Sequence, residues 1–113
     1  MRLILVPAMA IGLMPFAAQA EIQAISVRFD CERGVELPVT FVNSGQDSVA
    51  VMQIEGHQMT LYQEVSASGA RYGWPSDGSA YVLWTKGTEA TVYWRDGAAK
   101  TETAILSGCV QAE

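Results

Sequence analysis

Residues 21–113 alternate apolar and polar side chains with a period of two, and this pattern constrains the fold more than any other feature of the sequence. Successive side chains of a β-strand point to opposite faces of a sheet, so the alternation predicts strands that each bury one face. No helical periodicity follows residue 20, and the chain is therefore predicted to be all-β. The alternating runs are Ile25-Val27-Phe29, Val35-Leu37-Val39-Phe41, Val49-Val51, Met59-Leu61, Tyr81-Leu83, Ala90-Val92-Trp94 and Thr101-Thr103-Ile105.

Turn-forming residues separate these runs at intervals of about 8–12 residues. Seven or eight strands at this spacing predict a small antiparallel barrel or sandwich, and periodicity alone does not separate the two. Pro38 interrupts the second run and is predicted to lie on an edge or at a bulge, because proline has no N–H for a ladder hydrogen bond. The turn segments contain residues that tolerate a positive φ: Asn43-Ser44-Gly45, Glu55-Gly56, Asp77-Gly78, Lys86-Gly87 and Asp96-Gly97.

The first twenty residues have the composition of an export signal. Arg2 precedes an apolar run over residues 3–18, and the segment ends in the small-x-small tripeptide Ala18-Gln19-Ala20. The apolar run, at about 16 residues, is short for a membrane span. We therefore expect cleavage before Glu21, a mature domain of residues 21–113, and a soluble protein in the periplasm.

The chain has two cysteines, Cys31 and Cys109. An exported protein enters an oxidising compartment, and the even count predicts that the two form a disulfide. Such a bridge would enclose most of the mature chain and remove about 4.5 kcal/mol of denatured-state entropy in the loop-closure description. Two distant cysteines and the single His57 do not have the spacing of a zinc site, so no metal or other cofactor is expected.

Charge and size exclude several classes of protein. Without Arg2, six lysines and arginines remain against twelve aspartates and glutamates, which gives the mature chain a net charge of −6. An acidic surface disfavours nucleic acid and anionic lipid headgroups and speeds encounter with a basic protein, although solubility alone also accounts for it. The mature segment, with no internal repeat or linker, is predicted to be one domain with a thin core.

Two short segments near the middle of the chain resemble a known family. Ser66-Ala67-Ser68-Gly69-Ala70-Arg71-Tyr72 is similar to the SASGARY loop of the periplasmic and membrane-bound inhibitors of c-type lysozyme. Trp84-Thr85-Lys86-Gly87-Thr88-Glu89-Ala90 is similar to the WTKGDEA segment of the same family. The resemblance extends over nearly the whole mature chain. It implies an eight-stranded antiparallel β-barrel with one disulfide, no enzymatic activity, and a c-type lysozyme as the protein partner.

The resemblance also implies roles for individual residues. Ser68 and Lys86 would be the inhibitory contacts, entering the lysozyme cleft and meeting its two catalytic carboxyl groups. Without the resemblance, Ser68 would be interpreted as an ordinary turn serine and Lys86 as a solvated turn lysine. The other members of the two motifs would support a projecting loop: Gly69, Arg71, Tyr72, Thr85 and Gly87.

The sequence departs from the family pattern at several points. Thr88 occupies the place where the family has an aspartate, which affects the turn that carries Lys86. Gly73-Trp74-Pro75-Ser76 lengthens the segment after the first motif. No cysteine stands at the expected cleavage point, so we do not expect the lipid anchor of the membrane-bound branch.

Two other functions compete with inhibition. A barrel that binds a small ligand or a glycan would explain the aromatic strands, but a domain this short leaves little interior volume. Trp74, Trp84 and Trp94 suggest sugar stacking, yet two of them lie in alternating runs, where packing on the barrel wall is the ordinary use. An enzyme is disfavoured because the chain lacks a His-supported nucleophile, a Ser-x-x-Lys element and a Gly-x-Ser-x-Gly elbow.

Overall fold

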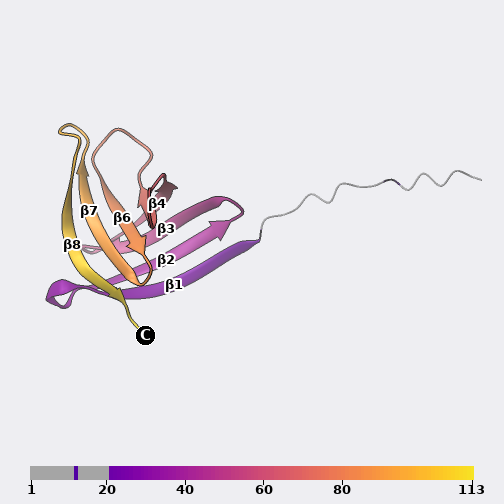
Figure 1. Ribbon diagram of the computed structural model, residues 1–113, viewed down its shortest axis with the longest axis horizontal. Helices are drawn as coiled ribbons and strands as arrows, with labels where there is room; N and C mark the ends of the chain where they lie inside the picture. The colour runs from indigo at the N-terminus through magenta and orange to yellow at the C-terminus, as the bar shows by residue number, and fades with distance from the viewer. Residues whose placement is uncertain (1–11, 13–20) are drawn as a thin grey trace, which may run out of the picture.

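The computed structural model describes residue 12 and residues 21–113, and the predicted export signal is otherwise outside the described residues (Figure 1). Eight strands form a closed antiparallel barrel in which each strand pairs with its neighbours in sequence and β8 returns to β1. This confirms the predicted all-β fold. No helix in the described part of the chain is long and apolar enough to cross a membrane. The elements are β1 (Ile22–Asp30), the 3₁₀ turn η1 (Glu32–Gly34), β2 (Glu36–Ser44), β3 (Asp47–Ile54), β4 (His57–Glu64), β5 (Ala70–Gly73), β6 (Ala80–Lys86), β7 (Glu89–Asp96) and β8 (Thr101–Gln111).

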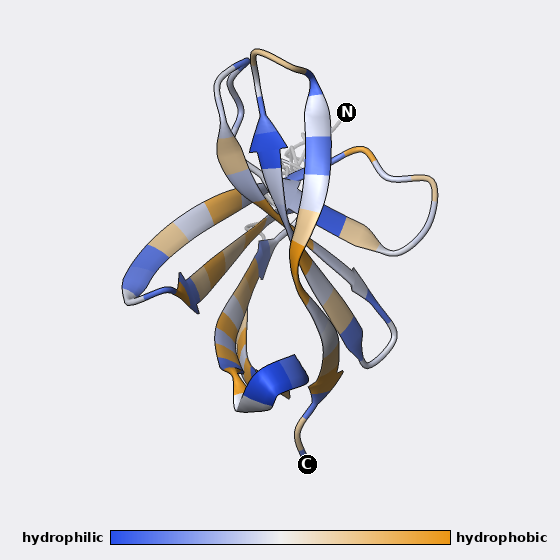
Figure 2. Ribbon diagram, turned by 90° about the vertical axis from the view of Figure 1, so that its left-hand side faces the viewer, coloured by the Kyte–Doolittle hydropathy of each residue, from blue (hydrophilic) through white to orange (hydrophobic). Residues whose placement is uncertain are grey.

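The barrel interior is filled by side chains from all eight strands. Leu37, Met52 and Leu83 are fully buried, and Phe29 and Val92 are exposed by 2% or less. Polar and apolar residues alternate along the strands, as Figure 2 shows, because every second residue faces this core. Burial of each such side chain contributes about 1.5–3 kcal/mol relative to an exposed position.

The positive φ angles predicted for the turns occur at Gly45, Gly56 and Gly87 but not at Gly78 or Gly97. Glu55 and Gly56 have φ angles of 52° and 77° in the two-residue turn between β3 and β4, a conformation that requires two positive φ values in succession. Pro38 lies beyond the end of the β2–β3 ladder, which begins at the pair Val39–Met52. Pro38 pairs with Arg28 of β1, so only its β3 side is an unpaired edge, where proline removes no ladder hydrogen bond.

One sequence prediction about the fold was wrong. Arg71 and Tyr72 were expected in a projecting loop, but they belong to strand β5, which pairs with β4 and β6. β5 has only four residues, and its last two, Tyr72 and Gly73, are both buried. Such a short strand carries no alternating signal, so only its pairing with longer neighbours reveals it. Thr85, also assigned to a supporting loop, lies within strand β6.

The barrel closes through a short contact between β1 and β8. Only two residue pairs join these strands, Phe29–Gln111 and Asp30–Val110. The backbone N–H of Ala112 adds a hydrogen bond of 2.8 Å to the carbonyl of Arg28. The predicted disulfide between residues 31 and 109 is confirmed, and it lies directly beside this contact.

The position of the disulfide leads to a prediction about stability. Replacing both cysteines by alanine is expected to lower the free energy of unfolding by up to about 4.5 kcal/mol, because the bridge closes a long loop in the denatured state. Urea unfolding followed by tryptophan fluorescence measures the change, with the parent protein under reducing conditions as an independent comparison. An unchanged unfolding midpoint in both experiments would show that the β1–β8 contact holds without the bridge.

Candidate functional site

The fold brings the two predicted contact residues to one end of the barrel. We call residues 65–69, which connect β4 to β5, the Ser68 loop. Lys86 ends strand β6 and precedes the two-residue turn to β7. The β5–β6 register pairs Ala70 with Thr85, so the preceding residue, Gly69, lies beside Lys86. Two motifs separated by about a dozen residues in sequence thus form one surface.

Gly69 permits this close approach. Its φ of +65° is unfavourable for other residues, and an added Cβ would lie 2.3 Å from the carbonyl oxygen of Thr85. The same Cβ would lie 3.2 Å from the Cβ of Lys86. Any side chain at this position would therefore push the Ser68 loop away from β6. The glycine has a structural role that its place in the motif did not reveal.

The backbone of Ser68 is held from two sides. Its carbonyl accepts hydrogen bonds from the indole Nε1–H of Trp84, at 3.0 Å, and from the hydroxyl of Ser66, at 2.6 Å. The hydroxyl of Ser68 itself is exposed and has no hydrogen-bond partner among the described residues. The loop is thus fixed through its backbone while the serine side chain stays available to a partner.

Trp84 has a second function in the site, which was not predicted. Packing on the barrel wall was expected, and Trp84 does lie in a strand, but its indole N–H also anchors the Ser68 loop. The spacing of two residues between Trp84 and Lys86 places both side chains on the same face of β6. The two-residue spacing in the sequence therefore indicated that Trp84 lies on the same face of the strand as Lys86.

Lys86 differs from the arginines of the chain in its contacts. It is exposed, and within residues 21–113 it makes no ion pair, whereas Arg28, Arg33 and two further arginines each pair with a carboxylate. Glu89 faces it across the hairpin in the strand register but forms no salt bridge with it. The ammonium group is therefore free to meet carboxylates of another molecule.

The turn after Lys86 is fixed by its backbone. Gly87 has a φ of 60° at the first central position, a conformation that suits the twist of a two-residue hairpin. The carbonyl of Thr88 accepts a hydrogen bond of 2.8 Å from the N–H of Gln111 on β8. Since this contact uses only main-chain atoms, the threonine in place of the family aspartate leaves the turn anchored.

Tyr72 and Arg71, neighbours in β5, point to opposite faces of the wall. Tyr72 is 6% exposed and packs inside the barrel, with its ring centroid 5.6 Å from that of Phe41. Arg71 lies on the outer face, with its guanidinium carbon 5.9 Å from the centroid of the Tyr93 ring. Both residues therefore support the base of the Ser68 loop, one from each side of the sheet.

A cluster of four charged side chains, Glu64, Arg71, Arg95 and Glu102, ties the base of the Ser68 loop to the outer wall. Arg71 donates from Nη2 to both carboxylate oxygens of Glu102, at 2.6 and 2.7 Å, and from Nε to Glu64 at 3.3 Å. Arg95 contacts both carboxylates as well, at 3.2 Å through Nη1 to Glu64 and at 3.0 Å through Nη2 to Glu102. Glu64 and Arg71 flank the loop, so the cluster joins its two ends.

The charged cluster rests on two small or apolar positions of the wall. Leu83 and Tyr81 face the barrel interior, so Val82, which lies between them in β6, faces outward. Val82 is nevertheless fully buried. The register places it between Arg71 and Arg95, which cover it. At Gly73, an added Cβ would lie 2.7 Å from a carboxylate oxygen of Glu64 and 3.2 Å from Arg95. Absence of a side chain at this residue leaves room for the cluster.

The cluster changes the protonation of Glu102. Partial burial raises the pKa of this carboxyl, but hydrogen bonds from Arg71 and Arg95, together with their positive charges, lower it by more. The net pKa of Glu102 is therefore below the ordinary value for a glutamate. The carboxylate stays ionised, and the network intact, at any pH near neutrality.

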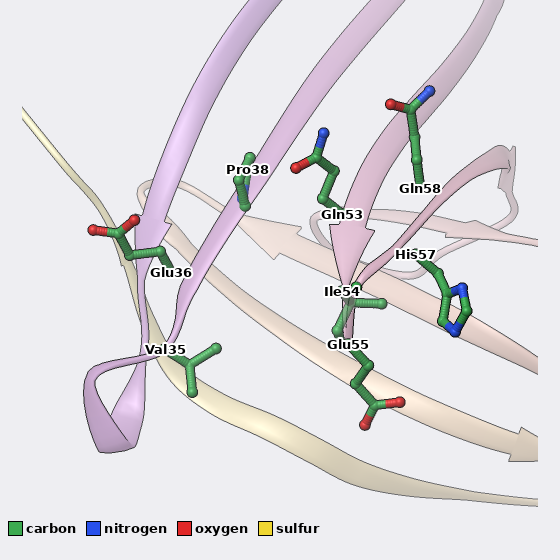
Figure 3. A pocket seen from close by; sticks show the side chains of 9 residues that line it. Val35, Glu36, Pro38, Gln53, Ile54, Glu55, His57 and Gln58 are labelled. Carbon is green, nitrogen blue, oxygen red and sulfur yellow. The ribbon is translucent and has the colours of Figure 1, made fainter.

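A separate hollow lies toward the other end of the barrel, where β2 and the β3–β4 hairpin meet (Figure 3). It has a volume of about 430 Å³, and Glu36, Glu55 and His57 are among the residues that line it. The Glu36 and His57 side chains come from different strands and point apart in Figure 3. Within residues 21–113, no group of three or more His, Cys, Asp or Glu side chains could hold a metal ion.

The structure therefore defines a small disulfide-bonded β-barrel that presents a fixed serine loop and an unpaired lysine at one end. The family described as membrane-bound lysozyme-inhibitor of c-type lysozyme matches residues 29–101. The chain belongs to this family, as its sequence motifs suggested. Its members are named for inhibiting an enzyme, in agreement with the expectation that this chain is not an enzyme itself.

Individual relatives are similar over most of the domain. The chain is 33% identical over 90 residues to the membrane-bound lysozyme inhibitor of C-type lysozyme of Pseudomonas aeruginosa, covering 77% of this chain and 68% of the relative. Identity to the Escherichia coli K12 protein of the same name is 36% over 96 residues, covering 83% and 81%. A crystal structure of Pseudomonas aeruginosa MliC in complex with hen egg white lysozyme is similar with a TM-score of 0.64 and 28% identity, covering 88% of this chain and 92% of that chain.

The charged cluster generates a pH-dependent prediction. Glu102→Gln is expected to lower the free energy of unfolding by about 1 kcal/mol at pH 7, since it removes charge-assisted hydrogen bonds that partial exposure weakens. The pKa of Glu102 is lower in the folded than in the unfolded state, so its contribution is complete above the unfolded value and is lost as the pH falls through the folded value. Urea unfolding at pH 7 and near pH 3 should therefore show a difference from the parent that shrinks in acid.

Glu36→Gln is the matched control for this experiment, because Glu36 is exposed and makes no ion pair within the described part of the chain. It should unfold like the parent protein at both pH values. If Glu102→Gln loses the same stability at both pH values, its effect comes from packing and not from the carboxylate charge.

Proposed function

We propose that this protein inhibits c-type lysozyme by inserting the Ser68 loop and Lys86 into the active-site cleft of the enzyme. Three observations support the proposal: membership of the family, the relative whose crystal structure includes hen egg white lysozyme, and the pairing of two exposed side chains on one surface. The position of these two exposed side chains on one surface is the observation that supports the mechanism. Ser68 and Lys86 come from different hairpins, and the contact of Gly69 with β6 holds them together.

The chemistry of the two side chains fits a lysozyme cleft. Lysozyme cleaves its substrate with two carboxyl groups, an acid and a nucleophile, about 5 Å apart. A lysine ammonium has three N–H donors and a serine hydroxyl has one O–H donor, so together they can satisfy both carboxyl groups. The inserted loop contains no glycosidic bond, and it occupies the space that the sugar chain requires. Inhibition then follows from steric exclusion and from neutralisation of the catalytic carboxylates.

Rigidity of the loop contributes to the proposed inhibition. A flexible loop would lose conformational freedom on entering the cleft, at a cost of about 0.5–1.5 kcal/mol for each side chain that becomes immobile. Here the hydrogen bond from Trp84 to Ser68 and the charged cluster at the loop base fix the backbone before binding. The loop therefore meets the enzyme in one arrangement.

We also propose that the protein acts after export, in the periplasm, where a lysozyme would reach it. The signal-like residues 1–20 motivate this proposal, and the disulfide of the described domain supports it, because such bonds persist in oxidising compartments.

Variants of the two contact residues test the mechanism. Loss of one partner from a buried charge pair costs about 2–5 kcal/mol, so Lys86→Ala should weaken inhibition by about 30-fold or more. Ser68→Ala removes a hydrogen bond to a charged group and should cost about 1.5–3 kcal/mol. Lysozyme clearing of a cell-wall suspension, titrated with each variant, measures inhibition. Stability should stay within about 0.5 kcal/mol of the parent because both side chains are exposed.

Lys100→Ala is the matched control for charge. Lys100 is exposed in the β7–β8 turn and likewise has no ion pair within residues 21–113, but it lies at the opposite end of the barrel. This variant should inhibit like the parent. If Lys86→Ala and Ser68→Ala also inhibit like the parent, the cleft mechanism is wrong even though the protein inhibits. If the parent itself leaves lysozyme active, the proposed function is wrong.

The acidic surface predicts a salt-dependent association rate. A net charge of −6 on residues 21–113 attracts a basic enzyme over long distances, and salt screens this attraction with a Debye length of about 8 Å at physiological ionic strength. Stopped-flow or surface-based kinetics across a salt series should show an association rate that falls steeply, with a smaller change in the dissociation rate. An association rate independent of salt would mean that the charge serves solubility alone.

A further inference from the structure

The short strand β5 leaves an opening in the barrel wall. Its last pairs are Tyr62–Gly73 with β4 and Tyr72–Leu83 with β6. Beyond them, residues 57–61 of β4 and residues 80–82 of β6 have no strand between them. The chain leaves the sheet there and returns through the loop of residues 74–79, which arches away from the strands (Figure 1).

An uncharged, aromatic cleft occupies this opening. Its volume is about 690 Å³, and none of its lining residues carries a charge, although the chain as a whole is acidic. Four aromatic rings line it, those of Tyr62, Trp74, Tyr81 and Trp94. Three of these residues are substantially exposed: Tyr62 by 44%, Trp74 by 48% and Trp94 by 39%. Monomeric proteins rarely expose several large aromatic side chains together without a binding partner.

The rings are held in pairs that leave faces open to solvent. Tyr62 and Trp74 pack edge to face, with centroids 5.7 Å apart and an interplanar angle of 62°. Tyr81 and Trp94 also pack edge to face, with centroids 5.1 Å apart and an interplanar angle of 74°. Edge-to-face contacts stabilise both rings of a pair without covering both faces of either ring. The cleft therefore offers aromatic platforms that are already in position before a ligand arrives.

Hydroxyl groups lie among the rings. Thr60 contributes one, and the hydroxyl of Ser79 accepts a hydrogen bond of 3.1 Å from the N–H of Gly97, which leaves its own hydrogen to donate. The Tyr81 hydroxyl donates to Glu55 at 2.6 Å, which leaves its oxygen able to accept. Donors and acceptors thus lie beside aromatic faces, among lining residues that carry no charge.

We propose that this aromatic cleft binds a neutral saccharide, with pyranose rings stacked on Trp74 and Trp94. The C–H bonds on one face of a pyranose carry partial positive charge and are attracted to the negative face of an aromatic ring. The sugar hydroxyls then match the hydroxyls of the cleft. An anionic ligand would find no countercharge among the lining residues, and an acyl chain would leave the remaining donors and acceptors of these hydroxyls unused.

The cleft is separate from the surface formed by Ser68 and Lys86. Tyr81, at the start of β6, lies five residues from Lys86, which corresponds to about 17 Å along a strand. A saccharide in the cleft would therefore leave the Ser68 loop accessible. The proposal does not depend on lysozyme inhibition, and either function can fail without the other.

Titration with the neutral tetramer of N-acetylglucosamine tests the proposal. Isothermal calorimetry and amide chemical shifts should report saturable binding with a Kd of about 1 mM or tighter. The shifts should be confined to β4, the 74–79 loop, the start of β6 and the end of β7 around Trp94. Trp74→Ala and Trp94→Ala should each weaken binding by about 2- to 10-fold, the range expected for one aromatic contact. Trp74→Phe keeps a ring face and should restore most of the affinity.

Trp84→Phe is the matched aromatic control, since Trp84 lies at the other end of β6 and does not line the cleft. It should bind the tetramer like the parent. The proposal is overturned if the tetramer does not bind at several millimolar, or if binding survives loss of both Trp74 and Trp94. It is also overturned if sedimentation shows that the parent dimerises and Trp74→Ala is monomeric, because the cleft would then be a self-association surface.

Discussion

Closure of the barrel depends on a contact of only two residue pairs between β1 and β8, reinforced by the disulfide between Cys31 and Cys109. β8 is the longest strand, and its register with β7 is irregular around Val92, which allows it to curve back toward β1. Without closure, β1 and β8 would be open sheet edges, which pair readily with other chains. The position of every hairpin, including the two that carry the proposed inhibitory residues, depends on this covalently held contact.

Gly73 connects the two surfaces of the protein. Its missing side chain leaves room for Glu64 and Arg95 to meet, and their cluster fixes the base of the Ser68 loop. The same residue ends β5, and the chain beyond it leaves the wall and opens the aromatic cleft. A longer β5 would close the cleft with a strand. One glycine thus contributes both to the rigidity of the loop and to the opening beside it.

The sequence predicted the elements with strong periodicity and missed those that depend on contacts between strands. The long runs, the turns at Gly45, Gly56 and Gly87, and the disulfide were predictable, because alternation, positive φ and cysteine count are local or compositional signals. At Gly78 and Gly97 the predicted positive φ does not occur. Strand β5 was not predictable, since four residues are too few to show the alternation of apolar and polar side chains. The hydrogen bond from Trp84 to Ser68 was also missed, because it depends on the register between β5 and β6. The family resemblance directed attention to Ser68 and Lys86, but their proximity follows only from the fold.

The distribution of the basic residues explains why a strongly acidic protein can present a cation to a partner. All four arginines of residues 21–113 pair with carboxylates of the same chain, and two of them form the cluster that supports the Ser68 loop. A guanidinium suits this role because its planar donors bind carboxylates in a fixed geometry. A lysine ammonium is a compact charge on a flexible stem, so it can adjust to carboxyl groups that belong to another molecule. The arginines therefore stabilise the barrel wall, and Lys86 remains available at its end.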